Sequence, residues 1–154
     1  TAAVKAVTSK PVFIKLSPNT ARIADFAIRA KENGADAVSA INTLVGTAFN
    51  IWTRKPKIHN VTGGLSGPAI KPVALAKVLE ISRNCDIPII GIGGISNSDD
   101  VLEFMIAGAT AIQLGTINFV QPDAATKIVN GIINYCETMK INKLRSLTAS
   151  YELN

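Results

Sequence analysis

Residues 87–94 read IPIIGIGG and residues 111–116 read AIQLGT, so the chain twice joins a short apolar run to glycine. Apolar runs of this length predict buried strands, and each glycine stands where a strand gives way to a helix. Because glycine lacks a Cβ, the backbone N–H groups there are open to a ligand above the strand ends, an arrangement that binds phosphate. The two runs therefore predict a phosphorylated ligand at one edge of a parallel sheet.

The rest of the chain alternates strands and helices around these runs. Strands are predicted at residues 12–16, 37–41, 87–92 and 111–114, and helices at residues 20–33, 71–83, 98–107 and 124–139. In the first helix the predicted apolar face consists of Ile23, Phe26, Ala27 and Ala30. Residues 42–68 are too long for an ordinary strand-to-helix loop, which favours a functional loop or a lid. The order predicts an α/β fold of four parallel βα units.

Four such units equal half of a TIM (β/α)8 barrel, in which phosphate sites are common after the seventh and eighth strands. The chain opens with the end of a predicted helix over residues 2–8, and no strand precedes it. A free-standing sheet of this size would leave two edges and one face insufficiently covered. We therefore expect residues 1–154 to be a single partial domain, the C-terminal half of a barrel that other chain segments complete.

The composition is that of a soluble globular protein, since 47% of the 154 residues are hydrophobic and 18% are charged. The net charge is +5, but the basic residues are scattered and aromatics are only 5%, so we expect an anionic small molecule and no nucleic acid. No apolar stretch approaches the roughly 20 residues that span a bilayer. We expect a cytoplasmic protein with no membrane partner. Cys85 and Cys136 lack metal-ligand spacing and are predicted to be inert structural thiols.

Polar side chains at the predicted strand ends are the candidates for chemistry. Lys15 interrupts an apolar strand, so its ammonium either serves a function at the strand end or escapes to solvent over a packed stem. Asn42 and Thr43 follow the next strand, where they can hydrogen-bond a planar polar ligand, although Asn42 equally suits an Asx-turn. Residues 62–68 read TGGLSGP, and these glycines permit a close backbone approach to a ligand.

His59 is the only histidine, and the lack of a second histidine or a paired cysteine nearby argues against a metal site. We expect His59 in a solvated loop. Phe49 and Trp52 are predicted to pack the long connection down onto the protein instead of touching a ligand.

An ordered series of motifs resembles the dihydroorotate dehydrogenase family. The motifs are IKLSPN at residues 14–19, INT at 41–43, RKP at 54–56, NVTGGLSGPAIKP at 60–72, GIGGI at 91–95 and GT at 115–116. The resemblance covers about residues 11–139, nearly the whole chain. The segment before the predicted helix at residues 71–83 is similar to that of the class 1B catalytic subunit, which works with an electron-transfer partner.

The resemblance implies that the protein oxidises dihydroorotate to orotate in pyrimidine biosynthesis, with FMN as the hydride acceptor. It implies that Lys15 lies beside the flavin pyrimidine ring, where a cation stabilises the anionic reduced flavin. The implied cofactor-binding residues are Lys15, Ile41, Gly67, Gly93, Gly94, Gly115 and Thr116, and the implied substrate-binding residues are Asn42 and Thr43. The last four cofactor positions suit the FMN phosphate because they coincide with the two glycine-ended runs.

The family's general base is a cysteine on a loop of the N-terminal half of the barrel, and nothing in this chain corresponds to that half. Cys85 and Cys136 lie in a helix-to-strand connection and in a helix, so we expect no catalytic residue here and no activity from this chain alone. The class resemblance implies a partner subunit that carries FAD and an iron–sulfur cluster, with NAD beyond it. We also expect an oligomer.

Two alternatives remain open at the level of sequence. One is a related FMN barrel such as the pyrimidine-oxidising domain of dihydropyrimidine dehydrogenase, although the motifs at residues 42–43 and 62–67 fit the first interpretation better. The other is a non-catalytic half-barrel that binds a phosphorylated ligand, two copies of which would close one barrel and hide both edges.

Overall fold

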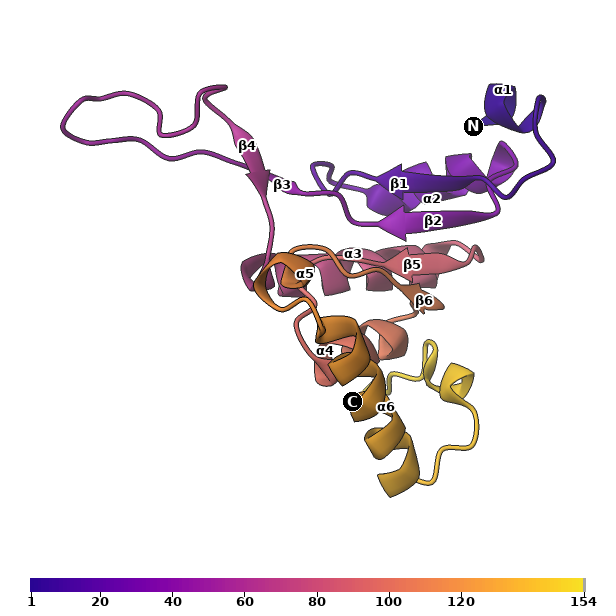
Figure 1. Cartoon of the computed structure of the whole chain (residues 1–154). Helices are drawn as coiled ribbons and strands as arrows, with labels where there is room; N and C mark the ends of the chain where they lie inside the picture. The colour runs from indigo at the N-terminus through magenta and orange to yellow at the C-terminus, as the bar shows by residue number, and fades with distance from the viewer. Residues whose placement is uncertain (154) are drawn as a thin grey trace.

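A parallel sheet forms the centre of the computed structural model, which describes residues 1–153 (Figure 1). It has four strands in the order β1-β2-β5-β6, and every neighbouring pair is parallel. The strands are β1 (Phe13–Leu16), β2 (Ala37–Ala40), β5 (Ile89–Gly91) and β6 (Ala111–Ile112). The predicted α/β class with a parallel sheet is confirmed. The strands are shorter than predicted because pairing with a neighbour covers only part of each apolar run.

Four longer helices follow the sheet strands and the glycine-rich segment. They are α2 (Ile23–Glu32), α3 (Lys71–Asn84), α4 (Ser98–Ile106) and α6 (Ala124–Thr138). Helices α2 and α3 contact each other and pack on β1, β2 and β5, while α4 packs against α6. The side chains buried between the sheet and these helices form one core, in which Ile23, Val38, Val78, Ile81 and Phe104 are fully buried.

The predicted apolar face of α2 is buried only in part. Ile23, Ala27 and Ala30 lie in the core, but Phe26 is 56% exposed, so its assignment to the core was wrong. At 3.6 residues per turn Phe26 lies about 60° to one side of Ile23, further from the centre of the stripe than Ala27 or Ala30. The buried stripe of α2 is therefore narrower than the predicted apolar face.

Two side chains satisfy the exposed amides at helix starts. Asn97 precedes α4 and its side chain accepts a hydrogen bond from the Asp100 N–H at 2.9 Å, the usual role of asparagine at a helix N-cap. Helix α2 is capped from another helix, because Glu80 of α3 accepts from the Ala24 N–H at 3.2 Å and pairs with Lys77 at 3.0 Å. Burial raises the pKa of Glu80, but the Ala24 amide and Lys77 outweigh it and hold this pKa below its ordinary value.

The long connection is an extended arm (residues 42–67), in which β3 (Leu44–Gly46) pairs antiparallel with β4 (Gly63–Leu65). Figure 1 shows the arm running away from the sheet and its helices. Trp52 is 87% exposed and Phe49 is 53% exposed, so the prediction that they pack the segment down was wrong. The arm satisfies its backbone by pairing with itself, which removes the need to fold back onto the protein.

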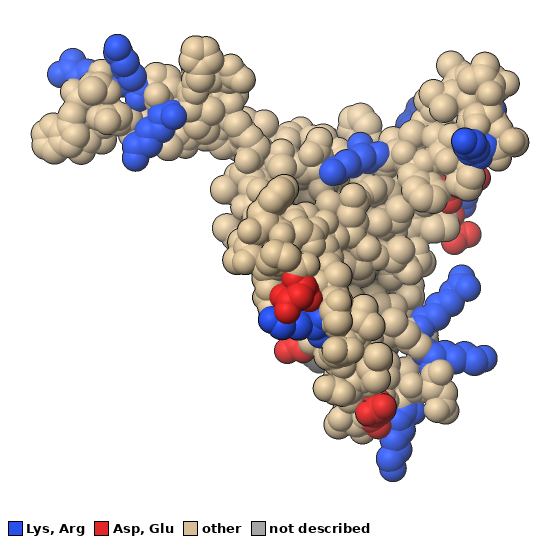
Figure 2. Space-filling model, viewed as in Figure 1, with Lys and Arg blue, Asp and Glu red and all other residues tan. Residues whose placement is uncertain are grey.

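The arm carries basic side chains and no acidic ones. Figure 2 shows Lys and Arg side chains gathered there, and the part between β3 and β4 carries Arg54, Lys55 and Lys57. His59 lies exposed in the same segment, which confirms its prediction as a solvated loop residue. Across residues 1–153, no group of three or more His, Cys, Asp or Glu side chains is arranged to hold a metal ion.

Short helical turns complete the structure. They are α1 (Ala2–Lys5), η1 (Pro68–Ile70), α5 (Ile117–Val120) and η2 (Leu144–Leu147). The first is shorter than the helix end predicted over residues 2–8, and it is tied to the sheet by a 2.9 Å ion pair between Lys5 and Asp36. Among the helices that the structure describes, none has both the length and the apolar character needed to cross a membrane.

Candidate functional site

A pocket of about 320 Å³ lies beyond the carboxyl ends of the sheet strands. Segments far apart in the sequence meet there: the end of β1, the residues after β2, the segment from Ser66 to Ile70, and the loops after β5 and β6. Every residue that the family resemblance assigned to cofactor or substrate lines this pocket: Lys15, Ile41, Asn42, Thr43, Gly67, Gly93, Gly94, Gly115 and Thr116. The structure thus brings all the sequence-predicted site residues together in one place.

The loops after β5 and β6 present backbone donors to this pocket. Within residues 1–153, the N–H groups of Gly93, Gly94, Gly115 and Thr116 donate to no protein acceptor. Gly94 has a φ of 74°, and a Cβ there would lie 2.7 Å from the Lys71 backbone nitrogen, so glycine is required for this close approach. A Cβ on Gly115 would meet nothing within 4 Å. Free amides beside open space are suited to an oxyanion such as phosphate.

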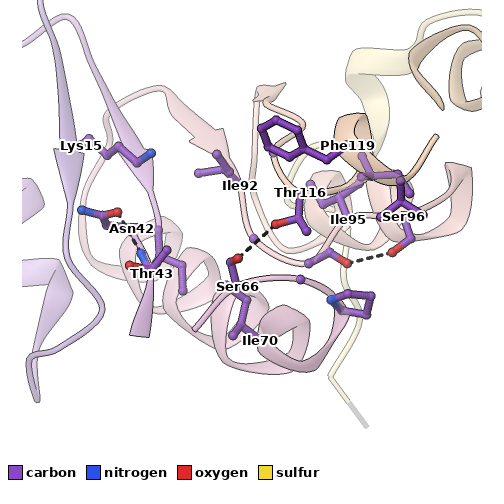
Figure 3. A pocket seen from close by; sticks show the side chains of 18 residues that line it. Lys15, Asn42, Thr43, Ser66, Ile70, Ile92, Ile95, Ser96, Thr116 and Phe119 are labelled. Carbon is purple, nitrogen blue, oxygen red and sulfur yellow. Dashed lines mark hydrogen bonds between the residues drawn. The ribbon is translucent and has the colours of Figure 1, made fainter. Parts of the chain in front are cut away.

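Lys15 brings a positive charge to the opposite side of the pocket. It comes from β1, whose alternate side chains Ile14 and Leu16 pack into the core, so Lys15 points away from the helices. Figure 3 shows its side chain on the same side as Asn42 and Thr43, across from Ser96 and Thr116. No carboxylate in the described part of the chain pairs with Lys15, which leaves its ammonium available to a ligand.

Asn42 and Thr43 are held by local hydrogen bonds. The Thr43 N–H donates to Asn42 Oδ1 at 2.9 Å, which is a contact with the next residue and not the contact two residues on that defines an Asx-turn. The side-chain amide nitrogen of Asn42 makes no hydrogen bond within the described residues. Asn19, in the turn after β1, donates to the Thr43 carbonyl at 3.1 Å and accepts from the Val45 N–H at 3.0 Å. Asn19 thereby fixes the backbone on both sides of Leu44.

The arm also limits where Thr43 can lie. A Cβ on Gly64 of β4 would collide with the Thr43 hydroxyl oxygen and lie 2.8 Å from Thr43 Cβ. Gly64 of the TGGLSGP motif therefore makes room for the pocket-lining side chain of Thr43. The importance of Asn19 and Gly64 was missed because their partners are distant in the sequence.

A hydrogen bond joins two segments that border the end of the pocket where the free amides lie. Thr116 donates to Ser66 at 3.1 Å, which connects the loop after β6 to the residues before η1 (Figure 3). Apolar side chains of α5 complete this wall, and Phe119 is 92% exposed although it lines the pocket. This wall was absent from the sequence prediction because a single turn of helix leaves no repeat of apolar residues to detect.

The two cysteines stand apart from the pocket. Cys85 is buried at the end of α3, where burial raises the pKa of its thiol, and Cys136 lies in α6. Neither lines the pocket. Their free state and positions agree with the prediction that they are structural thiols.

Comparison with known proteins gives one consistent result. Residues 1–135 match the family model described as dihydroorotate dehydrogenase. The catalytic subunit of dihydroorotate dehydrogenase B (NAD(+)) from Caldicellulosiruptor saccharolyticus is 50% identical over 153 residues, which are 99% of this chain and 51% of that protein. The protein of the same name from Geotalea daltonii is 49% identical over 150 residues, covering 97% of this chain and 49% of the relative. The chain spans about half the length of the curated relatives that it matches.

Proposed function

The chain belongs to the dihydroorotate dehydrogenase family, and on that premise we propose that it supplies part of the FMN and substrate sites of an enzyme that oxidises dihydroorotate to orotate. Such an enzyme serves pyrimidine biosynthesis. The observation that carries the proposal is the convergence of all the family-matched residues on one pocket. We call this chain together with the rest of the barrel the full-length protein.

We propose that the chain forms the C-terminal half of a TIM (β/α)8 barrel, as a single partial domain. Strands β1 and β6 each pair on one side only within residues 1–153, so both edges of the sheet are open to further strands. Phe13, on the face of β1 away from the helices, is 56% exposed. Edges and apolar faces of this kind are normally covered, and the missing strands of a barrel would cover both.

FMN fits the pocket by the chemistry of its lining. The unpaired N–H groups of Gly93, Gly94, Gly115 and Thr116 suit the phosphate, and the bare Cα of Gly115 leaves room for it. Ile41 and Gly67 also line the pocket. When bound, FMN accepts the hydride that leaves the substrate. The protein's part is to bind, orient and exclude water.

Lys15, Asn42 and Thr43 act at the other end of the pocket. The Lys15 ammonium stabilises negative charge that develops beside it, a contribution that preorganised cations make most strongly where water is excluded. Asn42 has its Oδ1 occupied by the Thr43 amide, so its NH₂ group faces the substrate as a donor. The Thr43 hydroxyl both donates and accepts. Together they orient a planar, polar pyrimidine ring.

The proton that leaves the substrate needs a base from outside this chain. The cysteines of this chain are away from the pocket, and its one histidine is exposed on the arm. We place the base in the remaining half of the barrel, so this chain alone is inactive. The relatives are named as catalytic subunits of an NAD(+) enzyme, which supports a partner subunit. We propose that this partner carries FAD and an iron–sulfur cluster and that the assembly is oligomeric.

A substrate panel tests the proposed reaction in the full-length protein. We expect orotate to form from dihydroorotate, with no comparable oxidation of dihydrouracil or dihydrothymine. Dihydroorotate carries a carboxylate that dihydrouracil and dihydrothymine lack, so the comparison tests recognition of that group. Preferred oxidation of dihydrouracil would contradict the assignment and favour the dihydropyrimidine dehydrogenase type of barrel.

A further inference from the structure

Asp100 is a buried carboxylate that the proposed chemistry does not use. Its side chain is 8% exposed, and it lies at the start of α4, outside the set of pocket-lining residues. A buried charge is unfavourable unless it is paired and hydrogen-bonded. Asp100 meets that condition: Oδ1 lies 2.6 Å from Lys71 Nζ, and Oδ2 accepts from the Ser96 N–H at 2.7 Å.

The two partners of Asp100 belong to two different loops of the pocket. Lys71 opens α3 directly after Gly67 and η1, and Ser96 follows Gly94 in the loop after β5. These loops are in close contact, since a Cβ on Gly94 would lie 2.9 Å from the Gly67 carbonyl oxygen. One carboxylate therefore holds together the two backbones that contribute most of the glycines to the pocket.

Asp100 also determines which donors remain free. It takes up the Ser96 N–H and, with Glu103 at 3.1 Å, the charge of Lys71. The hydrogen bond that Lys71 donates to Asp100, followed by the one that it donates to Glu103, raises the pKa of Lys71. The amides of Gly93 and Gly94 are left without a protein partner in the described residues. The anion-binding end of the pocket thus consists of backbone amides. Lys71 is structural, because its charge is paired with Asp100 and Glu103.

We propose that Asp100 is a positioning residue for the phosphate of the cofactor, acting through Lys71 and Ser96. The inference rests on the proposed FMN site. Its carboxylate holds the segment at residues 67–71 beside the loop at residues 93–96, and so keeps the free amides of Gly93 and Gly94 in place at the anion-binding end of the pocket. Because Asp100 lies outside the pocket lining, we expect its contribution to be confined to the phosphate.

The test compares FMN with riboflavin, which lacks the phosphate, in binding titrations of the full-length apoprotein. Asp100→Asn preserves the size of the side chain and removes its charge. We expect it to weaken FMN binding by about ten- to a hundredfold, by analogy with the loss of a residue that orients a metal ligand, and to leave riboflavin binding within about twofold. The matched control is Glu103→Gln, since Glu103 also pairs with Lys71 but is 48% exposed and does not contact Ser96. We expect it to leave both affinities within about twofold.

Lys71→Gln provides a second variant if Asp100→Asn does not fold, because it breaks the same ion pair from the more exposed side. It too should reduce the preference for FMN over riboflavin. An unchanged preference in a folded Asp100→Asn or Lys71→Gln protein would overturn the inference, as would an equal loss of both flavins. A wild-type protein that binds riboflavin as tightly as FMN would instead overturn the phosphate site, and the role of Asp100 with it.

Discussion

Replacing Gly94 with alanine tests whether the close approach of two pocket segments requires glycine for the stability of the fold. Gly94 has a φ of 74°, and an added Cβ would lie 2.7 Å from the Lys71 backbone nitrogen and 2.9 Å from the Gly67 carbonyl oxygen. The left-handed conformation costs alanine about 1–2 kcal/mol. Forcing a methyl group into a filled space costs about 1–3 kcal/mol more. The stiffer unfolded chain offsets only about 0.5 kcal/mol of this loss, so Gly94→Ala should lower the free energy of unfolding by about 2–4 kcal/mol.

Gly115→Ala is the matched control, because it makes the same change in the other phosphate loop. No atom lies within 4 Å of the added Cβ, and the backbone φ is not in the left-handed region. The free energy of unfolding should change by no more than about 0.5 kcal/mol. The methyl group occupies the proposed phosphate position, so FMN affinity should fall about tenfold or more, the value of one hydrogen bond to a charged group.

Urea denaturation of the full-length apoproteins and FMN titration together measure both effects. The account predicts that Gly94→Ala loses stability, and that Gly115→Ala keeps its stability while losing FMN affinity. Equal stability of Gly94→Ala and wild type would refute the close approach of the two loops. A Gly115→Ala protein that binds FMN normally would refute the placement of the phosphate.

Three further predictions concern the charge at the site, the cap of α2 and the core. Lys15→Ala should reduce the turnover of dihydroorotate by about 10²-fold, because the proposed role of this cation is to stabilise developing charge. It should have little effect on stability, because Lys15 pairs with no carboxylate among the described residues. Steady-state orotate formation measures the effect, and normal turnover would contradict the prediction. Glu80→Gln should cost about 1 kcal/mol at pH 7 because the Ala24 amide loses a charged acceptor. The folded-state pKa of Glu80 lies below its ordinary value of 4.5. The urea midpoint of the wild type should therefore exceed that of Glu80→Gln by the full amount above pH 4.5, and the difference should shrink as the pH falls below it. A difference that stays constant with pH would argue against the cap. Phe104→Ala should cost about 3–5 kcal/mol in urea denaturation. It should also relieve the cost of Gly91→Ala, whose Cβ would otherwise lie 2.6 Å from the Phe104 ring; additive losses in the double variant would disprove this contact.

The parallel sheet and the glycine loops were predictable because their signals are local. Apolar runs that end at Gly93, Gly94 and Gly115 specify buried strands and bare backbone without reference to the rest of the chain. The polar residues after β1 and β2 could be placed at one edge of the sheet because the carboxyl ends of parallel strands coincide. Chain order and strand direction were enough to bring Lys15 and Asn42 to the same pocket as these glycines.

Features that depend on contacts between distant segments were not predictable in the same way. The arm pairs β3 with β4 across a long intervening segment, and nothing local to Trp52 indicates that it stays exposed. Phe26 is apolar and correctly spaced, yet only the position of the neighbouring helices decides how wide a stripe of α2 is covered. The ion pair of Asp100 with Lys71 joins residues on two helices, and a sequence shows Asp100 only as an acidic residue in a first helical turn.

The central claim is that this chain holds the flavin phosphate and that the other half of the barrel completes the active site. The most direct measurement is FMN binding by flavin absorbance and fluorescence, made on this chain alone and after mixing with the N-terminal half, while orotate formation is followed in the same samples. The account predicts FMN binding in the mixture, with orotate formed only after mixing. No FMN binding under either condition, or orotate formation by this chain alone at the rate of the mixture, would contradict it.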